Sequence, residues 1–363
     1  MSRVCLSFAL CVMAAIGLPP RAAYAEPYLA VQQGYKCVTC HVNPTGGGLR
    51  NDFGLIFAQN VMPARTLPAS VPTWTGKITS FLRLGGDLRA SWNRDEVPNN
   101  PAKEDTKLRQ VRLYADLAVV PDRLSLYVDE YVAPEKPEEF EGYVFLNDPT
   151  RGWYLKGGKF YLPFGFRLQD QTAFVRELSG ISMTTPDTGV ELGLERPNFS
   201  AQLDYSNDNA NSGAGSRHQL TGQLVWVQTR YRLGTAASFT SSDAGNRRVG
   251  ALFAGLRTGP VAWLGEADLV HDEGFPEGAR SMLAALGELN WAMRKGQNLK
   301  LTAEYNDPDR SVHENQNTRW SVLYELTPLP FVQLRAGYRY YSGIRQNDFQ
   351  NRKTMFLEFH AFM

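Results

Sequence analysis

The chain has 363 residues and a formal net charge of +1 at pH 7, and 43% of its residues are hydrophobic. This balanced charge gives no strongly basic surface of the kind that nucleic acids bind, so we expect no nucleic-acid partner. Beyond residue 25, no apolar run approaches the roughly 20 residues that a membrane-spanning helix needs, which excludes such helices from the exported chain.

Residues 1–25 have the three parts of a secretory signal peptide. Arg3 supplies a positive start, residues 6–18 are predominantly apolar, and residues 23–25 (Ala-Tyr-Ala) form a small-x-small cleavage site. We therefore expect export from the cytoplasm and a mature chain that begins near Glu26.

The only two cysteines outside the signal peptide lie in the stretch GYKCVTCHVNPTGGG, residues 34–48. In an exported protein, Cys37 and Cys40 alone would indicate a disulfide or a redox-active pair. A zinc site would need four ligands, and the other four histidines are isolated in the sequence. The adjacent His41 completes a C-x-x-C-H motif, in which two thiols form thioethers to a haem and the histidine binds its iron. We predict one covalent haem c, and a disulfide is the alternative.

Residues 26–60 form the predicted haem-binding segment, and residues 61–76 form a proline-rich linker. A segment of about 35 residues rarely builds a sufficient core by itself, so the following chain must shelter the haem. We expect the segment to fold as a plug. Residues 43–48 (NPTGGG) then form a tight turn that passes close to the haem or to its enclosure, and a plain flexible loop is the alternative.

From residue 77 onward the chain alternates apolar and polar residues with a period of two, which is typical of strands with one apolar face. In FVQLRAGYRYY, residues 331–341, the apolar row runs from Val332 to Tyr340, and Arg335 and Arg339 lie on the other row. The pattern recurs in residues 78–92 and 111–119.

Sixteen such segments start near residues 77, 107, 124, 141, 152, 188, 199, 218, 231, 248, 261, 281, 298, 317, 331 and 353. Their links alternate between long ones such as DPDRSVHENQN and short ones such as RPN, as outer loops and periplasmic turns do in outer-membrane barrels. We predict an all-β fold: a transmembrane antiparallel β-barrel of about 16 strands over residues 77–363, with the short N-terminal haem-binding plug. A soluble all-β protein is the alternative.

The longest link, residues 162–187, follows the fifth predicted strand. Its place resembles that of the third loop of porins, which folds into the lumen, and GKFYLPFG (158–165) is similar to a stretch of anion-type porins. We expect a constriction, and a solvated surface loop is the alternative. The loop carries charge at Arg167, Asp170, Arg176 and Glu177 and bulk at Phe164, Phe166 and Phe174.

This layout of signal peptide, one C-x-x-C-H motif and barrel resembles the fused outer-membrane cytochrome-porins. The resemblance implies that one haem c carries electrons across the bacterial outer membrane, between an extracellular donor or acceptor and a periplasmic carrier such as a soluble cytochrome. The best-studied members oxidise ferrous iron at the cell surface, so iron is an implied substrate. Two other functions stay open: a passive porin with a structural or regulatory haem, and a soluble periplasmic sensor cytochrome.

The second axial ligand of the iron has two candidates. Met62 is the nearest methionine after His41 and lies in VMPAR, and methionine ligation would raise the reduction potential relative to a second histidine. His360 lies on the polar row of the last predicted strand, which ends on the periplasmic side where the plug enters. Its alternative role is to partner a lumen carboxylate.

Overall fold

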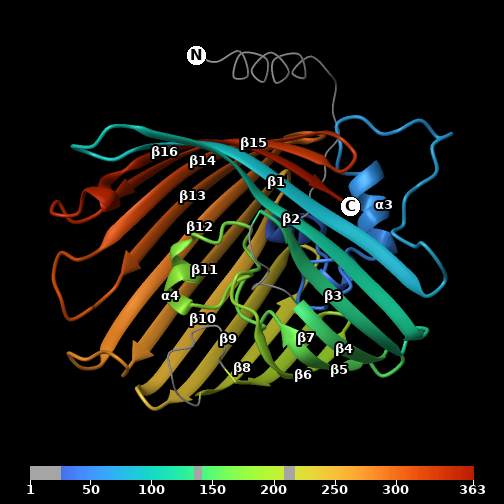
Figure 1. Ribbon diagram of the computed structural model, residues 1–363, viewed down its shortest axis with the longest axis horizontal. Helices are drawn as coiled ribbons and strands as arrows, with labels where there is room; N and C mark the ends of the chain where they lie inside the picture. Colours follow the sequence, from blue (N-terminus) through green and yellow to red (C-terminus); the bar gives the residue numbers. More distant parts are fainter. Residues whose placement is uncertain (1–25, 135–140, 208–216) are drawn as a thin grey trace.

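The computed structural model describes residues 26–134, 141–207 and 217–363, so the predicted signal peptide lies outside the described residues. Within this part, sixteen strands form one closed barrel in which each strand is antiparallel to its neighbours and β16 pairs with β1 (Figure 1). The predicted all-β antiparallel barrel is therefore confirmed.

The strands begin close to the predicted positions. The largest difference is at β1, because the Ile78 and Thr79 N–H groups donate to the Leu82 carbonyl at 2.9 and 3.3 Å and form a turn before the strand. The strands are β1 (Leu82–Glu96), β2 (Lys103–Val120), β3 (Leu124–Ala133), β4 (Glu141–Asp148), β5 (Trp153–Phe160), β6 (Asp187–Arg196), β7 (Phe199–Ser206), β8 (Arg217–Val227), β9 (Tyr231–Ser242), β10 (Gly245–Thr258), β11 (Val261–Asp272), β12 (Arg280–Arg294), β13 (Gln297–Asp307), β14 (Asn317–Leu329), β15 (Val332–Ser342) and β16 (Lys353–Phe362).

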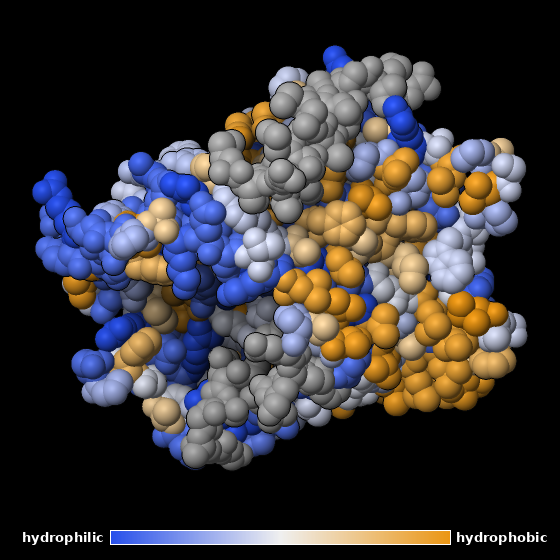
Figure 2. Space-filling view, turned by 45° about the horizontal axis from the view of Figure 1, so that its top comes forward, coloured by the Kyte–Doolittle hydropathy of each residue, from blue (hydrophilic) through white to orange (hydrophobic). Residues whose placement is uncertain are grey.

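The barrel wall has an apolar outer face and a polar inner face. Leu113 on β2 and Leu252 on β10 are exposed, whereas the alternate residues Arg112 and Tyr114 are buried inside. Figure 2 shows hydrophobic residues over the wall at the right and hydrophilic residues at the left end, where Figure 1 shows long connections. Such an apolar belt suits contact with lipid. Among the helices of the described residues, none is long and apolar enough to cross a membrane.

The N-terminal segment folds into two short α-helices and a 3-10 turn, α2 (Pro27–Gln33), η2 (Cys37–Thr39) and α3 (Asp52–Asn60). Proline occupies the first turn of α2, where its missing N–H costs nothing, and Gly34 ends the helix in the left-handed conformation with φ 69°. The Asn51 side chain caps α3 by accepting from the Gly54 N–H at 3.0 Å.

This plug lies inside the barrel at the end where the turns are short. Gly34 packs against the backbone of Thr229 in the β8–β9 turn. Lys36 forms an ion pair with Glu195 near the end of β6. The short turns are the periplasmic ones in an outer-membrane barrel, so this position agrees with entry of the plug from the periplasmic side.

The linker and the C-terminus lie at the same end. The Ala64 N–H donates to the Thr327 carbonyl near the β14–β15 turn at 2.8 Å, so the linker follows the rim. The Met363 N–H donates to the Gly86 carbonyl at 2.8 Å. The ribbon places α3 beside the C-terminus (Figure 1).

The long link between β5 and β6, called L3 below, folds into the barrel. It contains α4 (Phe174–Ser179), which lies within the barrel in Figure 1, and its aromatic residues Phe164, Phe166 and Phe174 are buried. The expectation of a loop that narrows the lumen is therefore confirmed, and the alternative of a solvated surface loop is wrong. Another long link, between β15 and β16, contains η4 (Asp348–Asn351).

Ionic contacts hold L3 to the opposite wall. Arg176 forms an ion pair with Glu266 on β11. Asp170 accepts from Arg319 on β14 at 2.9 Å and from Arg339 on β15 at 2.8 Å. Burial raises the pKa of Asp170, but the two guanidinium groups outweigh it and hold that pKa below its usual range.

The orientation predicts which connections face the cell exterior. An epitope tag inserted after Ser311, in the long β13–β14 link, should bind antibody on intact cells. A tag inserted after Gly259, in the short β10–β11 turn, should bind antibody only after the outer membrane is opened. Heat-modifiable gel migration of both variants checks that the barrel has formed, and labelling of the Gly259 tag on intact cells would contradict the orientation.

Candidate haem site between the plug and L3

The C-x-x-C-H motif forms one tight helical turn. The N–H groups of Cys40 and His41 both donate to the Cys37 carbonyl, at 3.1 and 3.0 Å. Both cysteines are free thiols in this structure. The turn therefore presents two unlinked thiols and an imidazole from adjacent positions.

Asn51 braces this turn from the start of α3. Its side-chain amide donates to the carbonyls of Val38 and Thr39 at 3.0 and 3.2 Å, and its N–H donates to the Cys40 carbonyl at 3.0 Å. Gly54 lies so close that a Cβ there would overlap the Cys40 carbonyl. The helix thus holds the motif in place through backbone contacts that a larger side chain would disrupt.

The glycine run after the motif turns the chain against the barrel wall. Gly46, Gly47 and Gly48 all have positive φ, between 59° and 90°. A Cβ on Gly48 would overlap the Tyr127 hydroxyl, which accepts from the Leu49 N–H at 3.1 Å. Residues 43–48 therefore form the expected tight turn, and this turn lies against the barrel wall. The alternative of a plain flexible loop is wrong.

Ion pairs fix the first residue of the plug. Glu26 contacts Lys300 on β13 and, at 3.3 Å, Arg335 on β15. Burial raises the pKa of Glu26, but Lys300 and Arg335 outweigh it and lower that pKa to about 2. The adjacent Tyr28 hydroxyl donates to Glu325 at 2.9 Å. Together with the contacts at Thr229 and Tyr127, these anchor the plug to strands on several sides of the lumen.

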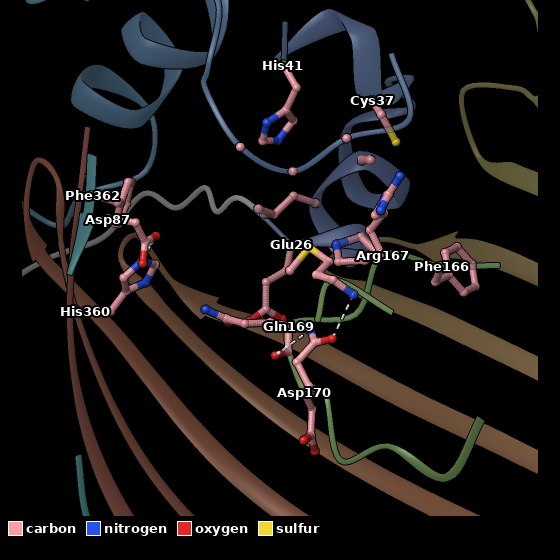
Figure 3. Close-up of a pocket in the computed structure, with 18 of the residues that line it drawn as sticks. Glu26, Cys37, His41, Asp87, Phe166, Arg167, Gln169, Asp170, His360 and Phe362 are labelled. Atoms are coloured by element: carbon pink, nitrogen blue, oxygen red, sulfur yellow. Dashed lines mark hydrogen bonds and ion pairs between the residues drawn. The ribbon is translucent and has the colours of Figure 1, made fainter. Parts of the chain in front are cut away.

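A cavity of about 640 Å³ separates the plug from L3 and the wall. This volume lies within the range of cofactor-binding pockets. Figure 3 shows Cys37 and His41 on the plug, Arg167 and Asp170 on L3, and His360 on the wall, around one space. Sequence reasoning predicted the motif residues, and the structure brings L3 to them.

The donor set fits a c-type haem. Burial, with the nearby Arg50, lowers the pKa of His41 to about 3, so its imidazole is neutral, and Nδ1 has no hydrogen-bond partner within the described residues. A neutral imidazole is the form that binds a metal. Burial raises the pKa of Cys40 to about 11, so its thiol is protonated. Cys37 and Cys40 would hold the thioethers, and His41 would bind the iron.

Both predicted distal ligands line this cavity. Met62 is buried, and its iron ligation stays a prediction. His360 uses both ring nitrogens: Nε2 is 2.6 Å from Asp87 Oδ2, and Nδ1 is 3.2 Å from Gln333 Oε1. It therefore partners a lumen carboxylate, as the alternative expected, and would lose a hydrogen bond on binding iron.

Sequence reasoning missed Met183, a thioether on L3. Its sulfur lies 3.4 Å from the position that a Cβ on Gly47 would take, in the turn after the motif. Met183 also lines the same cavity. No sequence signal places Met183 near His41, because the two residues meet only after L3 folds inward.

Solved structures show what the barrel is similar to. An anion-selective porin from Comamonas acidovorans is 8% identical with a TM-score of 0.62, and the match covers 78% of this chain and 99% of that one. A loop-deletion mutant of the outer-membrane protein OmpT of Vibrio cholerae is 10% identical with a TM-score of 0.60, over 78% and 99% of the two chains. The outer-membrane channel DcaP of Acinetobacter baumannii is 12% identical with a TM-score of 0.58, over 78% and 97%.

The fold is that of outer-membrane porins. No family model and no curated protein matches the chain. The three names are those of a porin, a channel and an outer-membrane protein, and none is a cytochrome, so the resemblance of the whole layout to cytochrome-porins stays a prediction.

The close approach at Gly48 predicts a destabilising substitution. In Gly48→Ala, the added Cβ would overlap the Tyr127 hydroxyl, and the backbone at residue 48 has the left-handed conformation that alanine disfavours. We therefore expect the free energy that holds the plug in place to fall by about 1–3 kcal/mol. Faster protease cleavage of residues 26–60 in the detergent-solubilised protein measures this loss. Gly157→Ala on β5 is the control, because a Cβ there meets nothing within 4 Å. Equal cleavage of both variants would show that the plug does not pack against Tyr127.

The Glu26 ion pairs predict a pH dependence of the plug. Since the folded pKa of about 2 is below the ordinary 4.5, the stabilisation is present above pH 4.5 and is lost as the pH falls toward 2. Glu26→Gln should lower the stability of the plug by about 3 kcal/mol at neutral pH and abolish the part of its pH dependence that comes from Glu26. Hydrogen exchange of residues 27–33 measures it. Asp52→Asn breaks pairs with Lys77 at 2.7 Å and with Arg83 at 2.6 Å, but the Asp52 side chain is 41% exposed, so each pair should contribute less than about 1 kcal/mol.

Proposed function

We propose that this chain is an outer-membrane porin-cytochrome, in which one haem c held by Cys37, Cys40 and His41 carries electrons across the bacterial outer membrane. The observation that carries the proposal is the position of the motif. Its free thiols and neutral imidazole line a cavity inside the barrel, between the plug and L3.

Membrane thickness explains why this position matters. The hydrocarbon layer is about 30 Å thick, so a redox group held outside the barrel would leave the full layer to cross. The plug sits at the short-turn end, and the cavity extends to Arg352, in the long link before β16. An extracellular donor or acceptor can therefore approach from the long-link end, and a periplasmic carrier such as a soluble cytochrome from the plug end.

The residues of this chain would bind, orient and shield the haem. Cys37 and Cys40 fix its edge, His41 binds the iron, and Asn51 holds the motif turn rigid. The haem supplies reversible one-electron chemistry when bound. The plug and L3 would reduce the access of water to the haem, and solvent exposure is one of the factors that set its reduction potential. Ferrous iron is a candidate donor on the family resemblance alone.

A passive porin is the second candidate, and the comparisons favour it. One solved structure of this fold is named as an anion-selective porin and another as an outer-membrane channel. L3 narrows the lumen here, and the cavity beside it is lined by several arginines, including Arg335, Arg339 and Arg352. In that case the haem would be structural or regulatory. The plug occupies part of the lumen, where it would narrow a solute path, and this supports the porin-cytochrome.

Reconstitution in sealed liposomes separates the two candidates. Electron transfer from an external reductant to an enclosed dye should occur with the natural chain and fall to the rate of empty liposomes in Cys37→Ala. Solute flux through the natural chain, without haem-dependent electron transfer, would instead establish the passive porin. Heat-modifiable migration checks that Cys37→Ala still forms a barrel. A haem-stained gel of separated membranes should show the band in the outer membrane.

A further inference from the structure

We propose that Arg50 and Arg167 form a carboxylate-binding pair beside the C-x-x-C-H motif. Its occupants are the two propionate carboxylates of the haem, an assignment that rests on the proposed function. The pair itself rests on two guanidinium groups that line the cavity and form no ion pair with a carboxylate of the described residues.

Arg50 is a buried cation without a counter-ion. It is 7% exposed, its Nε has no hydrogen-bond partner, and no carboxylate of the described chain lies within ion-pair distance. Its guanidinium lies 4.5 Å from the centre of the Phe362 ring. Its backbone forms a β-bridge with His41, which ties it to the motif. A buried charge without a counter-ion is strongly unfavourable, so binding of an anion next to Arg50 would be favourable.

Arg167 reaches the motif from L3. It donates to the Thr45 carbonyl at 3.3 Å, to Thr45 Oγ1 at 2.6 Å and to the Tyr161 carbonyl at 2.9 Å. All three acceptors are neutral, and Nη1 makes no hydrogen bond within the described residues. The charge of Arg167 also acts on the buried Glu141 carboxylate, which accepts from the Asn43 amide at 3.1 Å and from the Tyr161 N–H at 3.0 Å and forms no ion pair with Arg167. The Arg167 guanidinium is therefore held in place without a direct carboxylate partner among the described residues.

Most other arginines of the cavity are neutralised by the protein. Each has a carboxylate at hydrogen-bond distance: Arg89 with Asp87 at 3.1 Å, Arg109 with Asp105 at 3.1 Å, Arg335 with Glu358 at 2.9 Å and Arg339 with Asp170 at 2.8 Å. Arg232, which also lacks a carboxylate, donates to the Tyr35 carbonyl beside Cys37, where a thioether would form. Arg352, a further exception, lies over the rings of Tyr341 and Phe349 in the distant β15–β16 link.

The acidic group that faces Arg50 is already engaged. Asp87 lies beyond ion-pair distance from Arg50, and its two oxygens contact Arg89 at 3.1 Å and His360 at 2.6 Å. It therefore does not supply the missing counter-ion. A planar guanidinium matches a carboxylate through two parallel hydrogen bonds, and a haem carries two carboxylates for two arginines.

The first test uses the haem-loaded full chain. Midpoint potentials of Arg50→Gln and Arg167→Gln are measured across about pH 4–9. Removing a guanidinium beside a propionate should move the pH inflection of the potential upward by about 1–3 units. At neutral pH the potential should fall, because an uncompensated carboxylate favours ferric iron. Arg50→Lys, which keeps the charge, should shift less.

The matched control is Arg109→Gln, a cavity arginine that is already paired with Asp105. It should leave the inflection unchanged, and heat-modifiable migration shows that each variant folds. If the pH inflection of the midpoint potential is the same in Arg50→Gln and Arg167→Gln as in the natural chain, propionate binding by this pair is wrong.

The second test separates this site from the proposed function. A haem-free Cys37→Ser/Cys40→Ser chain is titrated with succinate by calorimetry, with and without Arg50→Gln. The natural chain can prove to carry no haem. In that case, succinate binding that is lost in Arg50→Gln supports a carboxylate-binding pair whose ligands are free carboxylates. In that chain, no binding, or binding that Arg50→Gln leaves intact, would overturn the pair.

Discussion

The closure of the sheet between β16 and β1 is the contact on which the rest of the molecule depends. A membrane offers no hydrogen bonds to an open strand edge, so every backbone group of the wall must find its partner in the sheet. Ten residue pairs, from Asp87 and Phe362 to Glu96 and Lys353, join these two strands. Closure also creates an interior, and that interior holds the plug and L3.

Charge compensation then decides how the interior is filled. Glu26 of the plug meets Lys300 and Arg335, Arg176 of L3 meets Glu266, and Asp170 of L3 meets Arg319 and Arg339. Buried charges are tolerated when they are paired, so these contacts orient both inserted segments. Among the cations that this arrangement leaves without an ion pair within the described residues, Arg50 and Arg167 lie beside the motif.

The candidate site is formed by the motif of the plug together with L3 and the wall of a porin-like barrel. A C-x-x-C-H turn needs shelter that about 35 residues do not supply, and the barrel provides it through Tyr127 and L3. L3, which narrows the lumen, also carries Arg167 and Met183 to the motif. A change in the position of L3 would therefore change the surroundings of the motif.

The sequence by itself determined the barrel, because a period of two and alternating link lengths are local properties of the chain. It also determined the motif at Cys37, Cys40 and His41, whose spacing lies within one helical turn. The start of β1 was predicted too early, since the turn at Ile78 depends on a hydrogen bond to Leu82. Only the tertiary structure decided the partners of His360, the wall residues that L3 contacts and the lack of an ion pair at Arg50. These are contacts between residues far apart in the chain, and no spacing or composition encodes them.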